Sequence, residues 1–198
     1  MTEHVDKGRR QLLTAATALT GAVGAAFAAA PFLASWKPSA RAKALGAPVE
    51  IDISKLEPGQ MIKVEWRGKP IWVLYRTKEM LADLQKHDSL LVDPLSKVAT
   101  QQPAYAQNPD RSIKPDYLVL IGVCTHLGCS PLPRFTPGDS QLGANWPGGF
   151  YCPCHGSKFD LAGRVFKDVP APTNLVVPPY RYLDDKHIMV GQDSTRAA

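Results

Sequence analysis

The chain has 198 residues, of which 44% are hydrophobic and 21% charged, and its net charge at pH 7 is +5. This length fits one or two domains, and the composition is typical of a globular protein. Lysine and arginine form no long run, so no nucleic-acid interface is indicated; the positive excess serves either solubility or docking on an anionic partner. The four cysteines lie in two short clusters with histidines, which favours metal chemistry over a disulfide framework.

Residues 12–36 contain no charged side chain and are predicted to form a transmembrane anchor, since a spanning helix needs about 20 apolar residues. The alternative is a cleaved signal peptide, with small residues at 28–30 or 40–42 as the cleavage site. The uncharged segment is longer than the apolar core of a signal peptide, which usually has about 7–15 residues. We therefore favour a retained single-pass anchor.

The residues before this segment look like an export signal. Basic residues flank the segment on both sides, so their distribution does not orient the helix. The pair Arg9-Arg10 and the residues after it resemble a twin-arginine signal, which would leave residues 1–11 in the cytoplasm and export the remainder. The match is loose, because the usual motif has Phe in place of Leu12 and often Lys in place of Thr14.

A linker is predicted at residues 37–48, which are polar and Ala-rich and contain the helix breakers Pro38 and Pro48. This segment is either a passive spacer or a hinge. A hinge would allow the part of the chain that follows to move relative to the anchor.

Short strands dominate residues 49–198, which are predicted to form a mainly antiparallel β head. Strands are expected where apolar residues alternate with polar ones or run continuously between turns, at 49–53, 61–66, 71–75, 117–123, 150–151, 165–166 and 187–190. The second and third of these form a hairpin around a turn at 67–70. Thr77 is the expected N-cap of one short helix at 77–86. Residues 88–115 are expected to be a loop.

Two cysteine–histidine clusters, CTHLGC at 124–129 and CPCHGS at 152–157, follow predicted strands. Structural zinc is one interpretation, but it needs four ligands, commonly in Cys-x2–4-Cys pairs, and would leave two cysteines over. A mixed-ligand iron–sulfur cluster fits better, because two imidazoles on one iron leave less negative charge and raise the reduction potential. Its expected thiolate ligands are Cys124 and Cys152 on one iron, and its expected imidazole ligands are His126 and His155 on the other.

These motifs resemble the Rieske [2Fe–2S] family, and more narrowly the high-potential Rieske subunits of quinol–cytochrome c reductases. The resemblance extends from the N-terminal segment through the head and implies one [2Fe–2S] cluster per subunit, bound by the part at about 122–172. Rieske oxygenases and their ferredoxins share the four ligands but lack the two further cysteines. Cys129 and Cys154 therefore favour the respiratory branch and are expected to form a disulfide, which implies an oxidising compartment.

The resemblance also assigns roles around the cluster. Ser157 resembles a serine whose hydroxyl bonds a bridging sulfide and raises the potential, although a turn hydroxyl bonded to local backbone is the alternative. Phe159 stands where many members have a Tyr that donates to a cysteine sulfur, which predicts a lower potential here. Leu127 would shield the tip, or merely pack there. The segment after Val169 resembles the family's covering proline loop, although that loop usually follows Gly. The expected surroundings are Ser157, Leu127, Gly128, Gly156, Phe159 and Pro170.

The family's activity is electron transfer. The resemblance implies that the chain oxidises a membrane quinol, here ubiquinol, and passes one electron to a membrane-bound c-type cytochrome, coupled to proton release. His155 is expected to bond the quinol oxygen, since a ligated imidazole keeps one free ring nitrogen whose pKa depends on the cluster charge. In a plain electron carrier, both histidines would simply be exposed ligands.

The expected setting is the bacterial inner (plasma) membrane, with the head in the periplasm. The second electron needs a cytochrome b partner, and the complex is expected to be dimeric. An alternative is the small Rieske subunit of a periplasmic oxidoreductase such as arsenite oxidase, which resembles the same motifs but would not keep a membrane anchor.

Overall fold

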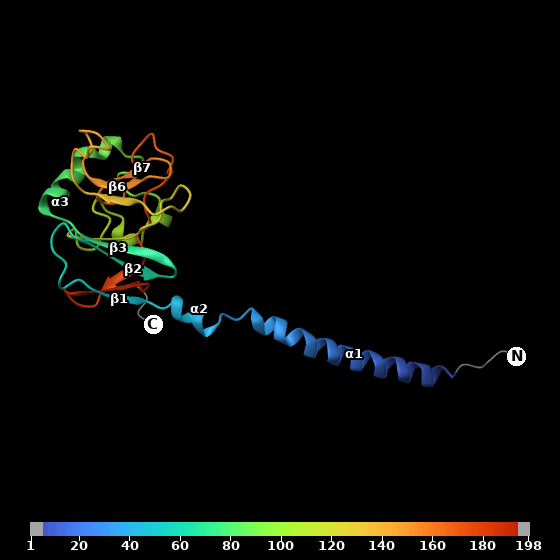
Figure 1. Cartoon of the computed structure of the whole chain (residues 1–198). Coiled ribbons are helices and arrows are strands. Elements are labelled where there is room, and N and C mark those ends of the chain that lie inside the picture. The colour runs from blue at the N-terminus through green and yellow to red at the C-terminus, as the bar shows by residue number, and fades with distance from the viewer. Residues whose placement is uncertain (1–5, 194–198) are drawn as a thin grey trace. The chain divides into compact units, whose positions relative to one another are not determined.

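The computed structural model describes residues 6–193, so the first five residues of the expected cytoplasmic segment lie outside the described residues. The chain divides into two compact units, Met1–Ala44 and Leu45–Ala198. Each unit is described by itself below (Figure 1).

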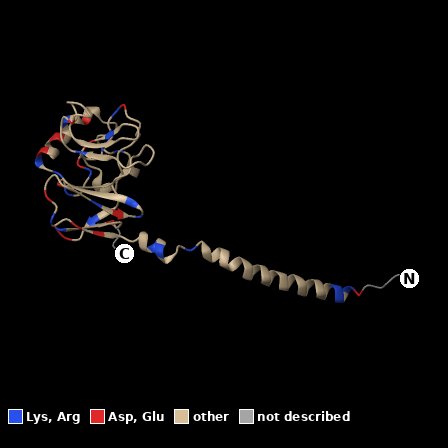
Figure 2. Cartoon of the chain, viewed as in Figure 1, with Lys and Arg blue, Asp and Glu red and all other residues tan. Residues whose placement is uncertain are grey.

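The first unit is dominated by helix α1, which runs from Lys7 to Ser35. The Asp6 side chain caps it by accepting from the backbone N–H groups of Gly8 and Arg9 at 3.0 and 3.2 Å. Within the described residues it is the one helix that is long and apolar enough to cross a membrane. No charged residue interrupts it beyond its first turn (Figure 2).

Helix α1 satisfies its own polar side chains. The hydroxyls of Thr14, Thr17 and Thr20 each donate to the carbonyl four residues earlier, at 2.8–2.9 Å. This pattern leaves few unpaired polar groups in an apolar segment, as a bilayer requires. A second helix, α2 (Ala40–Leu45), lies within the segment expected to be a linker, and its first turn is capped by the Ser39 hydroxyl. The proline and glycine signals in this segment gave no indication of α2.

Nine strands in the described residues form three antiparallel sheets of three strands each. The first has the order β1-β9-β8, from Val49–Asp52, His187–Val190 and Tyr180–Tyr182. The second has the order β2-β3-β4, from Met61–Trp66, Lys69–Tyr75 and Tyr117–Ile121. The third has the order β5-β6-β7, from Leu132–Arg134, Gly149–Cys152 and Ser157–Phe159. The predicted mainly antiparallel β fold is confirmed.

The β2-β3-β4 sheet provides the centre of the core. The hairpin turn at Arg67 and Gly68 has φ values of 52° and 70°, which suit the right-handed twist of the strands. Residues 71–74 of β3 and 118–120 of β4 are almost completely buried. In Figure 1, β6 and β7 lie at the end of the head opposite β1. Strand β6, which leads into the second cysteine cluster, therefore lies at that end of the head.

Between β3 and β4 the chain forms helix α3 (Lys78–Leu84) and three short 3-10 helices, η1 (Gln85–Leu90), η2 (Ala99–Gln101) and η3 (Ala104–Ala106). Thr77 is the N-cap of α3, as predicted, and accepts from the Met80 N–H at 3.2 Å. The predicted strand at 165–166 is wrong, because these residues form only isolated bridges, to Phe159 and Leu91.

Buried arginines fasten this long insertion to the rest of the head. Arg164 forms ion pairs with Asp160 at 2.7 Å and Asp88 at 2.8 Å. Arg111 donates to the carbonyls of Ala162 and Leu175. Because both guanidinium groups are fully buried, the carbonyls around them are held in fixed positions. The turn at 160–164, which follows β7, is thereby immobilised.

Candidate metal centre

Two loops with the same turn geometry extend from β4 and β6. In the first, the Cys124 carbonyl accepts from the Gly128 N–H at 3.1 Å. In the second, the Cys152 carbonyl accepts from the Gly156 N–H at 2.9 Å. The two glycines have φ values of 85° and 80°, in the left-handed region that side chains disfavour. Each loop thus turns over five residues from a cysteine to a glycine, which explains the glycine in both motifs.

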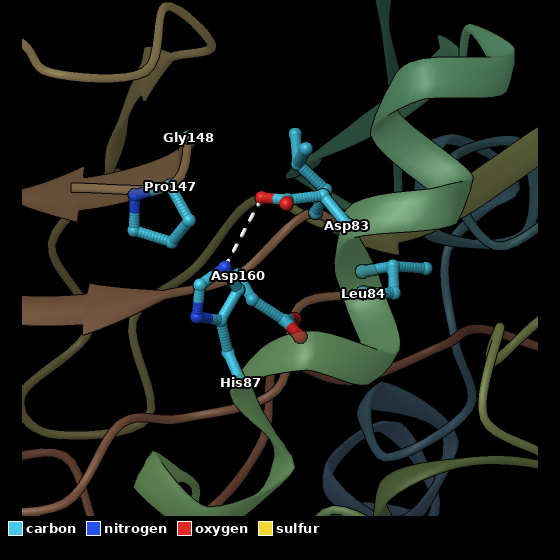
Figure 3. Close-up of a pocket in the computed structure, with 7 residues that line it drawn as sticks. Asp83, Leu84, His87, Pro147, Gly148 and Asp160 are labelled. Carbon is cyan, nitrogen blue, oxygen red and sulfur yellow. Dashed lines mark hydrogen bonds and ion pairs between the residues drawn. The ribbon is translucent and has the colours of Figure 1, made fainter. Parts of the chain in front are cut away.

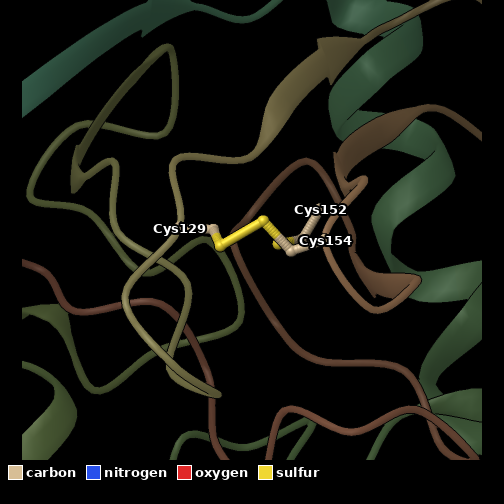
Figure 4. A group of neighbouring side chains, drawn as sticks. All are labelled: Cys129, Cys152 and Cys154. Atoms are coloured by element: carbon tan, nitrogen blue, oxygen red, sulfur yellow. A yellow bond between two sulfur atoms is a disulfide. The ribbon is translucent and has the colours of Figure 1, made fainter.

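The four cysteine sulfurs divide into a disulfide and a free pair. Cys129 and Cys154 form the expected disulfide, with their Cα atoms 6.7 Å apart (Figure 4). This bond joins the two loops directly. Cys124 and Cys152 are free, and only 3% and 2% of their surfaces are exposed.

The sulfur positions disfavour a single zinc ion. In zinc sites the metal–ligand distances are about 2.0–2.3 Å, so all ligand atoms lie within about 4.6 Å of one another. In the described part of the chain, the one group of three or more candidate ligand atoms within 4.8 Å of one another comprises the sulfurs of Cys129, Cys152 and Cys154. Two of these sulfurs are bonded to each other and cannot act as thiolates. These three sulfurs therefore cannot supply three ligands to one zinc ion.

The Cys152 sulfur lies in surroundings that suit a bound metal. Burial raises the pKa of this thiol, and the neighbouring Cys124 thiol raises it further. The backbone N–H groups of Cys154 and His155 bond to the same sulfur and lower its pKa. A cation coordinated to both sulfurs would remove their protons and compensate for the burial of the two thiolates.

The two histidines lie side by side on the outer part of the loops. The ring centroids of His126 and His155 are 4.7 Å apart, and their planes are inclined at 85°. His155 is exposed and His126 is half-buried. The free thiols are thus inside and the imidazoles outside, which fits a cluster with its sulfur-ligated iron buried and its nitrogen-ligated iron near solvent.

A third segment is fastened to both loops. The Thr125 hydroxyl of the first loop donates to the Thr173 carbonyl at 2.7 Å. The Ser157 hydroxyl oxygen, after the second loop, accepts from the Ala171 N–H at 3.1 Å. Residues 170–173 are therefore tied to both loops. Sequence reasoning missed Thr125, since a lone threonine in a loop carries no signal for a contact so distant in the chain.

The remaining predicted positions separate into buried and exposed ones. Ser157 and Phe159 are fully buried, and the Ser157 contact with Ala171 is not a local turn bond. Because that N–H occupies one lone pair of the hydroxyl oxygen, the Ser157 hydrogen is free to donate elsewhere. Leu127 is 71% exposed, and Pro170 is also exposed. The loop tips thus present a leucine and an imidazole to the surroundings.

A hollow elsewhere on the head has a different character. It is lined by Asp83, Leu84, His87, Pro147, Gly148, Asp160 and Leu161 (Figure 3). His87 Nε2 lies 3.1 Å from Asp83 Oδ2, and this pair holds α3 to η1. The hollow does not include the two cysteine loops.

Comparisons with known proteins agree with this geometry. The Rieske [2Fe-2S] domain model matches residues 49–181, and the model described as "Ubiquitinol-cytochrome C reductase Fe-S subunit TAT signal" matches residues 1–39. The ubiquinol-cytochrome c reductase iron-sulfur subunit of Allochromatium vinosum is 63% identical over 96% of this chain and 92% of its own. The same subunit of Blastochloris viridis is 44% identical over 92% of both chains.

A search of solved structures gave weaker similarities. The structure titled "Hyperthermophilic respiratory Complex III" has 27% identity and a TM-score of 0.47, and the match covers 90% of this chain and 98% of that one. The sequence matches, which are much stronger, decide the family.

Proposed function

Because this chain belongs to the Rieske [2Fe–2S] family, as an iron–sulfur subunit of ubiquinol–cytochrome c reductase, we propose that four side chains hold its cluster: Cys124, His126, Cys152 and His155. The chain is an electron-transfer subunit of an oxidoreductase complex with cytochrome partners. The observation that carries the ligand assignment is the pairing of two free, buried thiols beside a disulfide, with two imidazoles in edge-to-face contact outside them. When bound, the cluster accepts and releases one electron.

The thiols and imidazoles have different tasks in this proposal. Cys124 and Cys152 would hold the cluster from the buried side, where burial excludes water and the N–H groups around the Cys152 sulfur would stabilise negative charge. His126 and His155 would hold it from the exposed side as neutral ligands, which would keep the total charge low and the potential high. Ser157 would offer its free hydroxyl hydrogen to the cluster, which would also raise the potential.

His155 is the proposed contact with the quinol. Its imidazole is exposed, and its non-ligating ring nitrogen accepts the hydrogen bond from the quinol hydroxyl and then the proton. Leu127 is exposed at the tip of the other loop and offers an apolar surface to the quinol ring.

The proposed setting is the bacterial inner membrane. The twin-arginine signal and the apolar helix α1 fit a membrane-anchored subunit. We place residues 1–11 in the cytoplasm, α1 in the bilayer and the head in the periplasm. The partners are ubiquinol, a cytochrome b that takes the second electron and a membrane-bound c-type cytochrome, in a dimeric complex. Motion of the head on the segment 37–48 would let one head serve both the quinol site and the cytochrome.

Electron paramagnetic resonance of reduced membranes tests the ligand assignment. Cys124→Ser or His155→Cys should abolish or transform the rhombic signal of a histidine-ligated cluster. His87→Gln and His187→Gln are matched controls, since these histidines lie in the same head but bond to Asp83 and Asp184 instead. The assignment fails if a control removes the signal, or if the wild-type head contains zinc and gives no such signal.

A further inference from the structure

Trp72 lies between the two strands that carry the cluster loops. It belongs to β3, its side chain is 1% exposed, and it pairs in register with Leu120 of β4. Its ring stacks on Phe150 of β6, with centroids 5.1 Å apart and planes inclined at 20°. Phe150 is two residues before the ligand Cys152, so the ring supports the strand that leads into the second loop.

The same ring also supports the first loop, through Gly122, which is two residues before Cys124. A Cβ added to Gly122 would lie 2.1 Å from Cε2 of Trp72 and 2.4 Å from Cζ2 and Nε1. Gly122 does not have a positive φ, so backbone strain does not require glycine here. The indole ring itself occupies the space. In addition, the Gly122 N–H donates to the Pro70 carbonyl at 2.8 Å, which holds this segment against β3.

Hydrogen bonding does not explain the choice of tryptophan. The buried Nε1 of Trp72 has no hydrogen-bond partner among the residues that the structure describes. An unpaired buried N–H destabilises a core, so a purely apolar side chain would suit stability alone better. Lys63, opposite Trp72 on β2, places its ammonium nitrogen 5.9 Å from the ring centroid. What remains distinctive is the ring's size and its two contacts, Gly122 and Phe150.

We propose that Trp72 is a positioning residue that sets the spacing between the two cluster loops. Its ring connects Gly122 to Phe150, and through them the two sulfur ligands, so its thickness and width fix how far apart the loops begin. Cores are close-packed, and a gap at this point would let the loops shift relative to each other. The inference rests on the ligand assignment proposed above.

The experiment compares two tryptophans of one hairpin in the full-length chain, within its membrane complex. Trp72→Leu should lower the midpoint potential of the cluster and broaden its paramagnetic spectrum, because the N–H groups near the Cys152 sulfur would lose their alignment. It should also reduce the fraction of chains with the Cys129–Cys154 disulfide. Trp66→Leu is the matched control, since Trp66 is 6% exposed and contacts Gly191 after β9, away from the loops. It should lower thermal stability but leave potential, spectrum and disulfide unchanged.

Further variants decide the matter even if Trp72→Leu fails to accumulate. Trp72→Phe keeps an aromatic ring against Phe150 and should retain a nearly wild-type potential. Gly122→Ala should impair cluster assembly, and adding it to Trp72→Leu should cause little further loss, because the clashing ring is gone. The proposal is overturned if Trp72→Leu leaves the potential and the disulfide unchanged, if Trp66→Leu alters them equally, or if Gly122→Ala assembles normally. A wild-type protein without a histidine-ligated signal would instead refute the ligand assignment, while the disulfide fraction would still report the loop spacing.

Discussion

Removal of the Ser157 hydroxyl should lower the reduction potential of the cluster. Ser157 is fully buried, and its oxygen accepts from the Ala171 N–H, so no water replaces it in Ser157→Ala. The one remaining donor, the hydroxyl hydrogen, is available for a cluster sulfur. Such a bond stabilises the reduced, more negative cluster more than the oxidised one.

The size of the effect follows from hydrogen-bond energies. A hydrogen bond to a charged group is worth about 1.5–3 kcal/mol. For a one-electron couple a tenfold change in the equilibrium constant is about 59 mV, so this energy corresponds to a fall of at most roughly 65–130 mV. The Ala171 N–H also loses its acceptor, which should reduce the thermal stability of the cluster site.

Redox titration monitored by electron paramagnetic resonance measures the potential. Ser112→Ala is the matched control. Ser112 is 2% exposed, and its hydroxyl accepts from Arg76 at 2.8 Å rather than from a residue of the two cysteine loops or of the segment 170–173. The control should lose stability and keep its potential. An unchanged potential in Ser157→Ala, or an equal fall in Ser112→Ala, would refute the reasoning.

Three further predictions concern the head and the linker. Asp160→Asn leaves the fully buried Arg164 with the partly exposed Asp88 as its one remaining carboxylate partner among the described residues, and should lower the free energy of unfolding by about 3 kcal/mol, since breaking buried pairs costs about 3–5 kcal/mol. Asp185→Asn breaks the matched exposed pair Lys114–Asp185 and should lower the free energy of unfolding by less than about 1 kcal/mol in calorimetry of the complex. Equal losses in the two variants would contradict the burial argument. The hydrogen bond that protonated His187 donates to the Asp184 carboxylate raises the pKa of His187. Its stabilising effect is therefore complete below the ordinary value of 6.5 and is lost as pH rises through the higher folded value. His187→Gln should flatten the dependence of the melting temperature on pH in this range, and a pH dependence identical to that of the wild type would contradict the prediction. Prolines in place of Ala42–Ala44 should break α2 and slow quinol oxidation without altering the cluster spectrum, whereas undiminished turnover would argue against head motion on this segment.

The sequence predicted those parts of the fold whose signals are local. Strand β2 has the predicted bounds, and Thr77 caps α3 as expected, because alternation and capping act within a few residues. The strands β5, β7 and β8 were not predicted, since three residues are too few to display a period of two. Val165–Phe166 resembled a strand because both residues are apolar, but each has only a single bridge partner.

The same distinction applies to the metal centre. The free thiols and the disulfide followed from motif spacing and resemblance, and the structure has both. The supports of the loops did not follow, because they join distant segments: Thr125 bonds residue 173, and Trp72 of β3 stacks on Phe150 of β6. No periodicity or short motif encodes contacts of that separation.

The two hydroxyl bonds that fasten the segment 170–173 also affect the rate of electron transfer. Thr125 holds this segment to one loop and Ser157 holds it to the other, while the disulfide joins the loops themselves. Dipoles restrained in this way need not rotate when the charge nearby changes by one unit. We therefore expect the protein's share of the reorganisation energy to be small, so that the electron arrives and leaves with little rearrangement of its surroundings.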